Sequence, residues 1–249
     1  MTVDLTIVDL ASDGPWLVEA ERQLPRLGDG EAERLRGIVR PEIASRFAAT
    51  HIALRLALEL RVGPKFRRAP FTFGAHGKPE LAGTGLSFNL AHSTNFALIA
   101  VSEAGPVGVD IEQLRVVRMT DARRERLIGA AEALGGPFNP AKFNRDATFL
   151  MAWTRLEAFA KATGEGIGSL LTQLFMRSGS SDSQEPVALL MAALQRKELR
   201  IEDIGPGNSV APDWPALPDD APVFAALALP AAASIRFLKL DPTLANKRD

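Results

Sequence analysis

One stretch near the middle of the chain constrains the fold more than any other: F-L-M-A-W-T-R-L-E-A-F-A-K-A-T-G-E-G, which begins at Phe149. Four of its residues recur at intervals of four and would form one continuous stripe on an α-helix: Phe149, Trp153, Glu157 and Lys161. The glycines that close the stretch are typical of the position just past a helix C-terminus. The sequence therefore predicts a central helix with an aromatic face that enters a core and two opposite charges near its end.

Two interpretations of Glu157 and Lys161 are open at this point. On a helix they can form an ordinary i,i+4 ion pair, which contributes roughly 0.2–0.5 kcal/mol. They can also belong to a functional site, because a second pair of carboxylates, Asp110 and Glu112, stands upstream in G-V-D-I-E.

This upstream segment has the alternation of a β-strand, in which successive side chains point to opposite faces. One face would be aliphatic, with Val107, Val109 and Ile111, and the other would carry Gly108, Asp110 and Glu112. Two carboxylates about 7 Å apart along a strand repel each other unless a cation or protons lie between them. The pattern fits either a solvated strand face or a Mg²⁺ site in which the glycine leaves room for a ligand.

The composition restricts the classes of protein to which the chain can belong. Among 249 residues, 29 Lys+Arg and 30 Asp+Glu give a net charge of −1, which favours neither nucleic acid nor a membrane as partner. There is no cysteine, no apolar run of the roughly 20 residues that a membrane span needs, and no signal peptide at the start. We therefore expect a cytoplasmic protein.

Positive charge is concentrated between Arg34 and Arg68, where nine basic residues face two acidic ones, a local surplus of seven. Such a segment suits phosphate groups or an acidic partner. Much of it falls on a helix that is predicted to begin at Pro41 and to end at Gly63. Taken singly, its arginines could equally be solvated.

Hydrophobic periodicity predicts the remaining elements. Residues 86–92 and 96–101 should form a hairpin, and His92 should follow the first of these strands in the same register as Phe88. The other expected elements are a strand at 3–7, a loop with a short helix at 11–30, a helix at 119–134, a strand at 170–176, a helix or strand at 187–194, and strands at 223–229 and 235–240. Residues 178–184 and 205–222 should be irregular.

Three blocks of the sequence together resemble a known family. They are F-N-L-A-H-S (88–93), G-V-D-I-E (108–112) and W-T-R-L-E-A-F-A-K (153–161), with G-K-P (77–79) before them. Their order and spacing are similar to the signature blocks of the Sfp-type 4′-phosphopantetheinyl transferases. The likeness extends from Arg34 to Gly168.

The resemblance implies an α+β fold of two similar α/β halves related by a pseudo-twofold axis. Residues 1–106 would form the half with the basic nucleotide-binding segment, and residues 107–249 the half with the acidic metal-binding residues. It also implies a monomeric, Mg²⁺-dependent enzyme that transfers the 4′-phosphopantetheine arm of coenzyme A to a serine of an apo acyl or peptidyl carrier protein. The reaction would release 3′,5′-ADP and serve fatty-acid, polyketide or nonribosomal peptide biosynthesis.

The same resemblance implies a role for each residue of the blocks. The metal ligands would be Asp110, Glu112 and Glu157, and Lys161 would hold a phosphate and act in catalysis with Glu157. The proton acceptor is open among Glu157, Glu112 and a water on the metal. The residues around the adenosine 3′-phosphate end would be Arg34, Arg46, Lys78 and His92.

Two positions depart from the family pattern. Leu156 stands where many members have lysine, which would shift a basic contact for the coenzyme to Arg155. Ala91 stands where a serine often precedes the histidine, so one hydroxyl donor is missing.

Two other classes of protein could use the same residues. Another Mg²⁺-dependent phosphotransferase or phosphohydrolase would need the same carboxylates, and a non-catalytic carrier-binding relative would be expected to lack at least one of them. We further expect that exposed members of a basic group steer an acidic carrier: Arg61, Lys65, Arg67 and Arg68.

Overall fold

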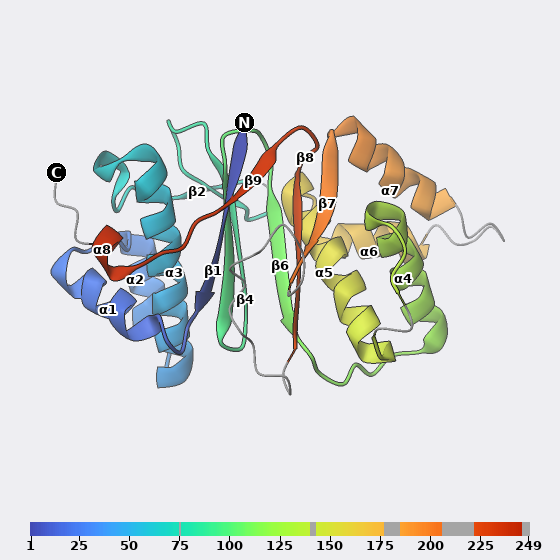
Figure 1. Ribbon diagram of the computed structural model, residues 1–249, viewed down its shortest axis with the longest axis horizontal. Coiled ribbons are helices and arrows are strands. Elements are labelled where there is room, and N and C mark those ends of the chain that lie inside the picture. Colours follow the sequence, from blue (N-terminus) through green and yellow to red (C-terminus); the bar gives the residue numbers. More distant parts are fainter. Residues whose placement is uncertain (75, 140–142, 177–184, 206–221, 246–249) are drawn as a thin grey trace.

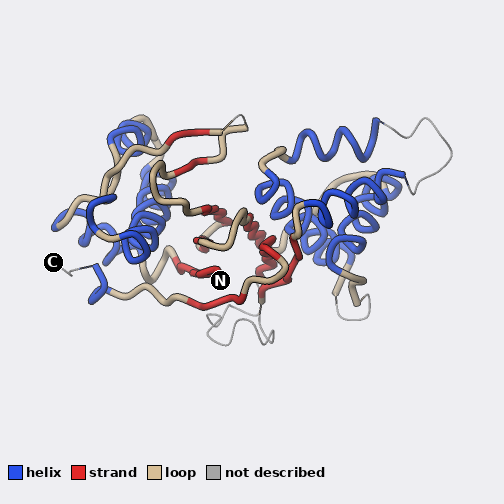
Figure 2. Tube along the Cα trace, turned by 90° about the horizontal axis from the view of Figure 1, so that it is seen from above, coloured by secondary structure: helices blue, strands red, loops and turns tan. Residues whose placement is uncertain are grey.

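Two β-sheets lie side by side between two outer layers of helices, as the two views show (Figure 1, Figure 2). The computed structural model describes residues 1–74, 76–139, 143–176, 185–205 and 222–245. The first sheet has the spatial order β4 (Ser87–Ser93), β5 (Phe96–Ser102), β1 (Thr2–Asp9) and β9 (Ser234–Phe237). The second has the order β6 (Gly108–Gln113), β8 (Val223–Pro230) and β7 (Leu199–Ile204).

Each sheet has its own helices. The helices on the side of the first sheet are α1 (Gly14–Gln23), α2 (Asp29–Arg36), α3 (Pro41–Val62) and the short C-terminal α8 (Pro242–Ala245). Those on the side of the second sheet are α4 (Asp121–Gly135), α5 (Arg145–Thr163), α6 (Ile167–Met176) and α7 (Glu185–Arg196). A 3₁₀ turn (Pro64–Phe66) and a two-stranded hairpin of β2 (Thr72–Phe73) and β3 (Pro79–Glu80) connect α3 to β4.

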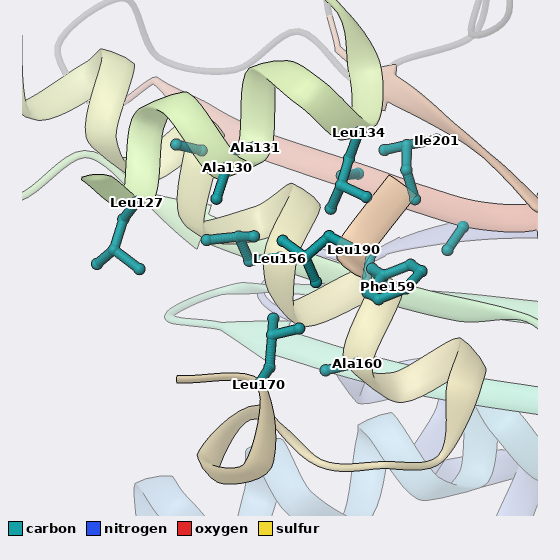
Figure 3. Close-up of a cluster of buried hydrophobic side chains, with 14 of the residues drawn as sticks. Leu127, Ala130, Ala131, Leu134, Leu156, Phe159, Ala160, Leu170, Leu190 and Ile201 are labelled. Atoms are coloured by element: carbon teal, nitrogen blue, oxygen red, sulfur yellow. The ribbon is translucent and has the colours of Figure 1, made fainter. Parts of the chain in front are cut away.

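Three hydrophobic clusters fill the spaces between these four layers. One joins the first sheet to α1 and α3, and one joins the second sheet to α4, α5 and α6 through residues such as Leu127, Leu156 and Phe159 (Figure 3). The third lies between the two sheets and includes Leu5, Leu98 and Leu227. The sheets therefore share a core and are not merely linked by the chain.

Polar side chains of β4 join the two sheets at their edges. Three backbone N–H groups, two in β6 and one in the residue just before it, donate to them: Val107 N to Ser87 Oγ (3.4 Å), Val109 N to Asn89 Oδ1 (2.9 Å) and Gln113 N to Ser93 Oγ (3.1 Å). Each pair is 20 residues apart, so β4 and β6 run in the same direction. Ala91, one of the two family departures, stands at the position in this row that has no polar side-chain atom.

Helix α3 begins and ends where the sequence predicts, and α5 ends where it predicts. Pro41 occupies the first turn of α3, and the helix ends at Gly63, whose φ of 83° few other residues adopt. At the start of α5 the side chain of Asn144 accepts a hydrogen bond from Ala147 N (2.9 Å), and the helix ends at Gly164 in the left-handed conformation.

Most of the predicted elements are confirmed, and the mixture of helices and sheets is compatible with the predicted α+β class. The predicted strand at 170–176 is wrong, because these residues are in helix α6, and residues 187–194 are in helix α7. Helix α2 and strand β7 were not expected. Residues 178–184 and nearly all of 205–222 lie outside the described residues.

No helix in the described ranges combines the length and the apolar character that crossing a membrane requires.

Candidate active site between the two halves

The acidic face of β6 is turned toward helix α5. Gly108 lies so close to this helix that a Cβ atom placed on it would be 2.1 Å from Ala158 O and 2.4 Å from Ala162 N. The expectation that Gly108 leaves room for a ligand is therefore wrong, because the backbone of α5 occupies that space. Glycine is required here for the close approach of the helix, and this approach brings the charged end of α5 to Asp110.

Asp110 and Lys161 form the centre of the site. Lys161 Nζ donates to Asp110 Oδ1 (2.7 Å) and to Val109 O (3.1 Å). The other oxygen, Asp110 Oδ2, is buried and has no hydrogen-bond partner. Burial raises the pKa of Asp110 to about 7, although Lys161 opposes this, and the negative charges of Glu157 and Glu112 raise it further.

Glu157 and Glu112 lie close enough to Asp110 to act on its charge. Burial raises the pKa of Glu157; Lys161 opposes this and Glu112 adds to it. Glu112 also forms an ion pair with Arg115 (Oε1 to Nη2, 3.3 Å). Across the residues that the structure describes, no three acidic or histidine side chains are already arranged around one point that a metal ion could occupy.

His92 lies at the end of β4, among basic groups from three different elements. Its pKa is lowered first by burial and then by the positive charges of four neighbours: His51, Lys161, Arg46 and Arg34. Three residues of the predicted 3′-phosphate group, Arg34, Arg46 and His92, are thus brought together, and Lys161 connects them to the carboxylates. His51 was not predicted. The one sequence signal for it is its position four residues after Phe47, which places both side chains on the same face of α3.

Lys78, the fourth member of that predicted group, makes a different set of contacts. Its Nζ donates to Val107 O (2.9 Å), Lys161 O (2.9 Å) and Ala162 O (3.5 Å). The last two are carbonyls of the final turn of α5, where a cation also interacts well with the helix dipole. Burial lowers the pKa of Lys78 to about 8, and Glu80 opposes the shift. In this structure the lysine fastens the hairpin 72–80 to the second half.

A cleft of about 590 Å³ lies next to the contacts between Lys78 and the end of α5. One wall is formed by the hairpin and the start of β4, including Lys78 and Phe88, and the other by Pro106 and the end of α5 at Thr163. Lys78 therefore connects the two walls of the cleft.

Arg155, the other predicted coenzyme contact, lies inside the second half. It is 4% exposed and donates from Nε and Nη2 to the two carboxylate oxygens of Asp203 on β7 (2.7 and 2.6 Å). Its Nη1 donates to Ala131 O and Gly136 O, and the guanidinium lies over the ring of Phe138. The structure does not bring Arg155 to the carboxylates of β6, because these internal contacts occupy its guanidinium.

Ion pairs also occupy part of the basic segment from Arg34 to Arg68. Four of its arginines pair with carboxylates: Arg55 with Glu31, Arg61 with Asp4 and Glu103, Arg67 with Glu59, and Arg68 with Asp29. Three of the four residues that were expected to steer an acidic carrier are therefore engaged within the chain. Lys65 is exposed and lies near the ring of Phe66.

Comparison with known proteins identifies the family. The chain is 33% identical over 174 residues to a Synechocystis protein assigned as a 4′-phosphopantetheinyl transferase, which covers 64% of this chain and 68% of the relative. It is 34% identical over 148 residues to the 4′-phosphopantetheinyl transferase HetI of Nostoc, with 58% and 62% covered. It is 32% identical over 157 residues to the 4′-phosphopantetheinyl transferase AcpT of Salmonella typhi, with 61% and 74% covered.

No protein-family model matches the chain. The identity to these relatives and the extent of their length that is matched are nevertheless sufficient to decide the assignment: the chain belongs to the 4′-phosphopantetheinyl transferases and is an enzyme of this kind.

Proposed function

We propose that this enzyme transfers the 4′-phosphopantetheine arm of coenzyme A to a serine of an apo acyl or peptidyl carrier protein and releases 3′,5′-ADP. One observation carries the proposal. Basic groups of the first half act on the charge of His92, Lys161 acts on both His92 and Asp110, and Glu157 and Glu112 act on Asp110, from which we infer a continuous strip of charged groups. Such a strip suits a substrate with phosphate groups at two places along its length.

The carboxylates are suited to a divalent cation of the Mg²⁺ type. Asp110 has a buried oxygen without a partner, and its pKa is raised first by burial and then by repulsion from Glu157 and Glu112. Oxygen donors with negative charge are what hard cations bind. We propose that Asp110, Glu112 and Glu157 hold Mg²⁺, which would neutralise charge on the pyrophosphate of the coenzyme.

The side chains of the strip then have separate tasks. Arg34, Arg46 and His92 bind the adenosine 3′-phosphate end, and Lys161 holds a phosphate of the pyrophosphate beside Asp110. The carrier serine attacks the phosphorus that bears the pantetheine arm, the bond to 3′,5′-ADP breaks, and the serine proton is accepted by a carboxylate. Glu157 suits this last role because burial raises its pKa, whereas Glu112 is paired with Arg115.

The fold is compatible with two halves that meet at residue 106 and are related by a pseudo-twofold axis. Each half would consist of a sheet with one long outer helix, α3 or α5. One segment crosses this division, since β9 pairs in parallel with β1 and so returns to the first sheet. We propose this division together with a monomeric state and a cytoplasmic location.

The direct test is to incubate the enzyme with coenzyme A, Mg²⁺ and an apo carrier protein and to measure the intact mass of the carrier. The proposal predicts a gain of one phosphopantetheine group that depends on the carrier serine. Release of 3′,5′-ADP without modification of any carrier would instead indicate a phosphohydrolase. A stable complex with the carrier and no reaction would indicate a binding protein.

A further inference from the structure

His51 lies on α3 and belongs to a stack of side chains that includes Phe47 and Arg34. Its ring stacks on that of Phe47, with centroids 4.1 Å apart and an interplanar angle of 28°. The guanidinium of Arg34 lies 5.2 Å from the centre of the same Phe47 ring. The stack fixes the plane of the imidazole, and 20% of the His51 side chain remains exposed.

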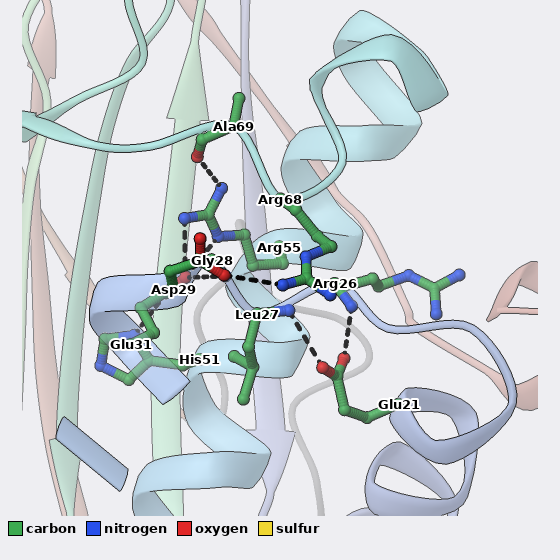
Figure 4. Close-up of polar contacts among 10 residues, drawn as sticks. All are labelled: Glu21, Arg26, Leu27, Gly28, Asp29, Glu31, His51, Arg55, Arg68 and Ala69. Carbon is green, nitrogen blue, oxygen red and sulfur yellow. Dashed lines mark hydrogen bonds and ion pairs between the residues drawn. The ribbon is translucent and has the colours of Figure 1, made fainter. Parts of the chain in front are cut away.

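Glu31 fixes the rotation of the imidazole within this plane. Its Oε1 lies 2.8 Å from His51 Nδ1 (Figure 4). Its Oε2 accepts from the Nε of Arg55 (2.7 Å) and from the backbone N–H of Gly28 (2.9 Å). A carboxylate anchored in this way at the start of α2 can move little.

The Glu31 carboxylate is also ionised at neutral pH. Burial alone would raise its pKa, but hydrogen bonds from His51, Arg55 and Gly28, together with the charge of Arg55, lower it. The Nδ1 atom of His51 therefore carries hydrogen and donates to Glu31. The contact with Glu31 uses only Nδ1, so Nε2 can bind a ligand. Carboxylates orient metal-binding histidines in the same way, through the ring nitrogen that does not bind the metal.

Outside the pair lies His92 with its basic neighbours. Of the four groups whose charge acts on His92, His51 has the largest effect, ahead of Lys161, Arg46 and Arg34. Like charges held together in this way repel one another unless an anion lies between them. An anion bound at His92 would therefore also interact electrostatically with His51.

We propose that His51, oriented by Glu31 and Phe47, is a further phosphate-binding residue of this enzyme and contacts the 3′-phosphate of the substrate through Nε2. The inference rests on the proposed function, because it takes coenzyme A as the substrate. It adds to the site a residue that none of the signature blocks contains.

Two substitutions separate a phosphate contact from a structural role. In His51→Asn the side-chain amide can still donate to Glu31 from near the Nδ1 position but has no counterpart of Nε2. In His51→Gln the amide reaches toward the Nε2 position and is less suited to Glu31. Lys65→Gln is the matched control, since it removes an exposed positive charge of the same half.

The experiment is calorimetric titration of wild type and variants with adenosine 3′,5′-bisphosphate and with adenosine 5′-phosphate. We expect His51→Asn to weaken binding of the bisphosphate about tenfold and to leave the 5′-phosphate almost unchanged. His51→Gln should recover part of the loss, and Lys65→Gln should change neither affinity.

Three results would overturn the proposal: wild-type affinity for the bisphosphate in His51→Asn, equal weakening of both ligands, or a wild-type enzyme that does not prefer the bisphosphate. Failure of the proposed reaction is a separate outcome. An enzyme that prefers the bisphosphate and loses this preference in His51→Asn, but modifies no carrier, would contradict the reaction and leave the role of His51 in place.

Discussion

Asp110 is the residue on which the charge balance of the site depends. It brings a carboxylate into a region that is almost closed to water, with one oxygen bound to Lys161 and the other without a partner. A carboxyl group in such a place favours its neutral form unless a cation compensates for the lost hydration. Without a metal ion, the folded protein should therefore bind a proton at Asp110 more tightly than the unfolded chain does.

This difference predicts how the stability of the metal-free enzyme depends on pH. The pKa of Asp110 is about 7 in the folded state against 3.8 for an ordinary aspartate. Between these values the folded state holds more protons than the unfolded one, so the free energy of unfolding should fall as pH rises from about 4 to 7. In Asp110→Asn this part of the decline should be absent, which urea unfolding in the presence of a chelator measures.

Adding Mg²⁺ to the same unfolding experiment tests whether Asp110 binds the metal. At pH 7.5 it should raise the midpoint of wild-type unfolding, because a ligand of the folded state stabilises it, and it should have little effect on Asp110→Asn. The transfer activity of this variant should be at least about 100-fold lower. Identical pH profiles for the two proteins would show that Asp110 is not the residue that titrates.

At the scale of elements, the contact between β6 and α5 determines whether the site can form. Gly108→Ala would place a methyl group against the backbone of Ala158 and Ala162, which can be relieved only if the helix moves. We expect a loss of about 3 kcal/mol or more in the free energy of unfolding, the upper range for overpacking, together with loss of activity.

A matched control for this substitution is available on α4. Gly129 is a helical glycine with no atom within 4 Å of an added Cβ, so Gly129→Ala should stabilise the protein by about 0.5–1 kcal/mol. Chemical denaturation of both variants tests the pair of predictions. A Gly108→Ala protein as stable and active as wild type would mean that α5 does not pack against β6 as described.

The hairpin 72–80 gives a third prediction, because Lys78 holds it against α5. Lys78→Met keeps the length of the side chain and removes the bonds to Val107 O and Lys161 O. Amide hydrogen exchange in the hairpin should accelerate about tenfold or more, which corresponds to the loss of about 1.4 kcal/mol of local stability. Unchanged exchange together with weaker coenzyme binding would instead support the predicted role of Lys78 as a ligand of the nucleotide.

The sequence predicted the elements that have a clear hydrophobic period and failed for short segments that have none. The stripe on α5 and the alternation on β6 were correct because each shows a clear period, of four residues on the helix and of two on the strand. Helix α6 was predicted as a strand because a short apolar run such as 170–176 fits either structure. Strand β7 was missed because Arg200, Glu202 and Asp203 make it look like a polar loop.

The candidate site shows the same limit. The signature blocks predicted Asp110, Glu157, Lys161 and His92. In the structure Lys161 bonds to Asp110, and its charge acts on Glu157 and His92. The contacts of Lys78 and Arg155 depend on carbonyls and on a carboxylate far away in the sequence, so no local pattern could reveal them. The pairing of His51 with Glu31 likewise joins residues 20 positions apart on two helices.

At the scale of the whole molecule, side chains of β4, an edge strand of the first sheet, accept hydrogen bonds from β6, an edge strand of the second, beside the hydrophobic cluster between the two sheets. This junction places the end of β4 beside the end of β6, so the candidate site draws its residues from both sheets and from the helices that cover them. The basic residues Arg34 and Arg46 belong to the first half, and the carboxylates belong to the second. We therefore propose that the substrate extends across this junction, with its pyrophosphate at the carboxylates and its nucleotide end at His92.

The most direct measurement of this claim is a crystal structure of the enzyme with coenzyme A and Mn²⁺, in which anomalous scattering locates the metal. The account predicts one strong peak within about 2.5 Å of carboxylate oxygens of Asp110 and its acidic neighbours and of the coenzyme pyrophosphate. The 3′-phosphate should lie beside His92. A metal bound elsewhere, or a coenzyme bound entirely within one half, would contradict the account.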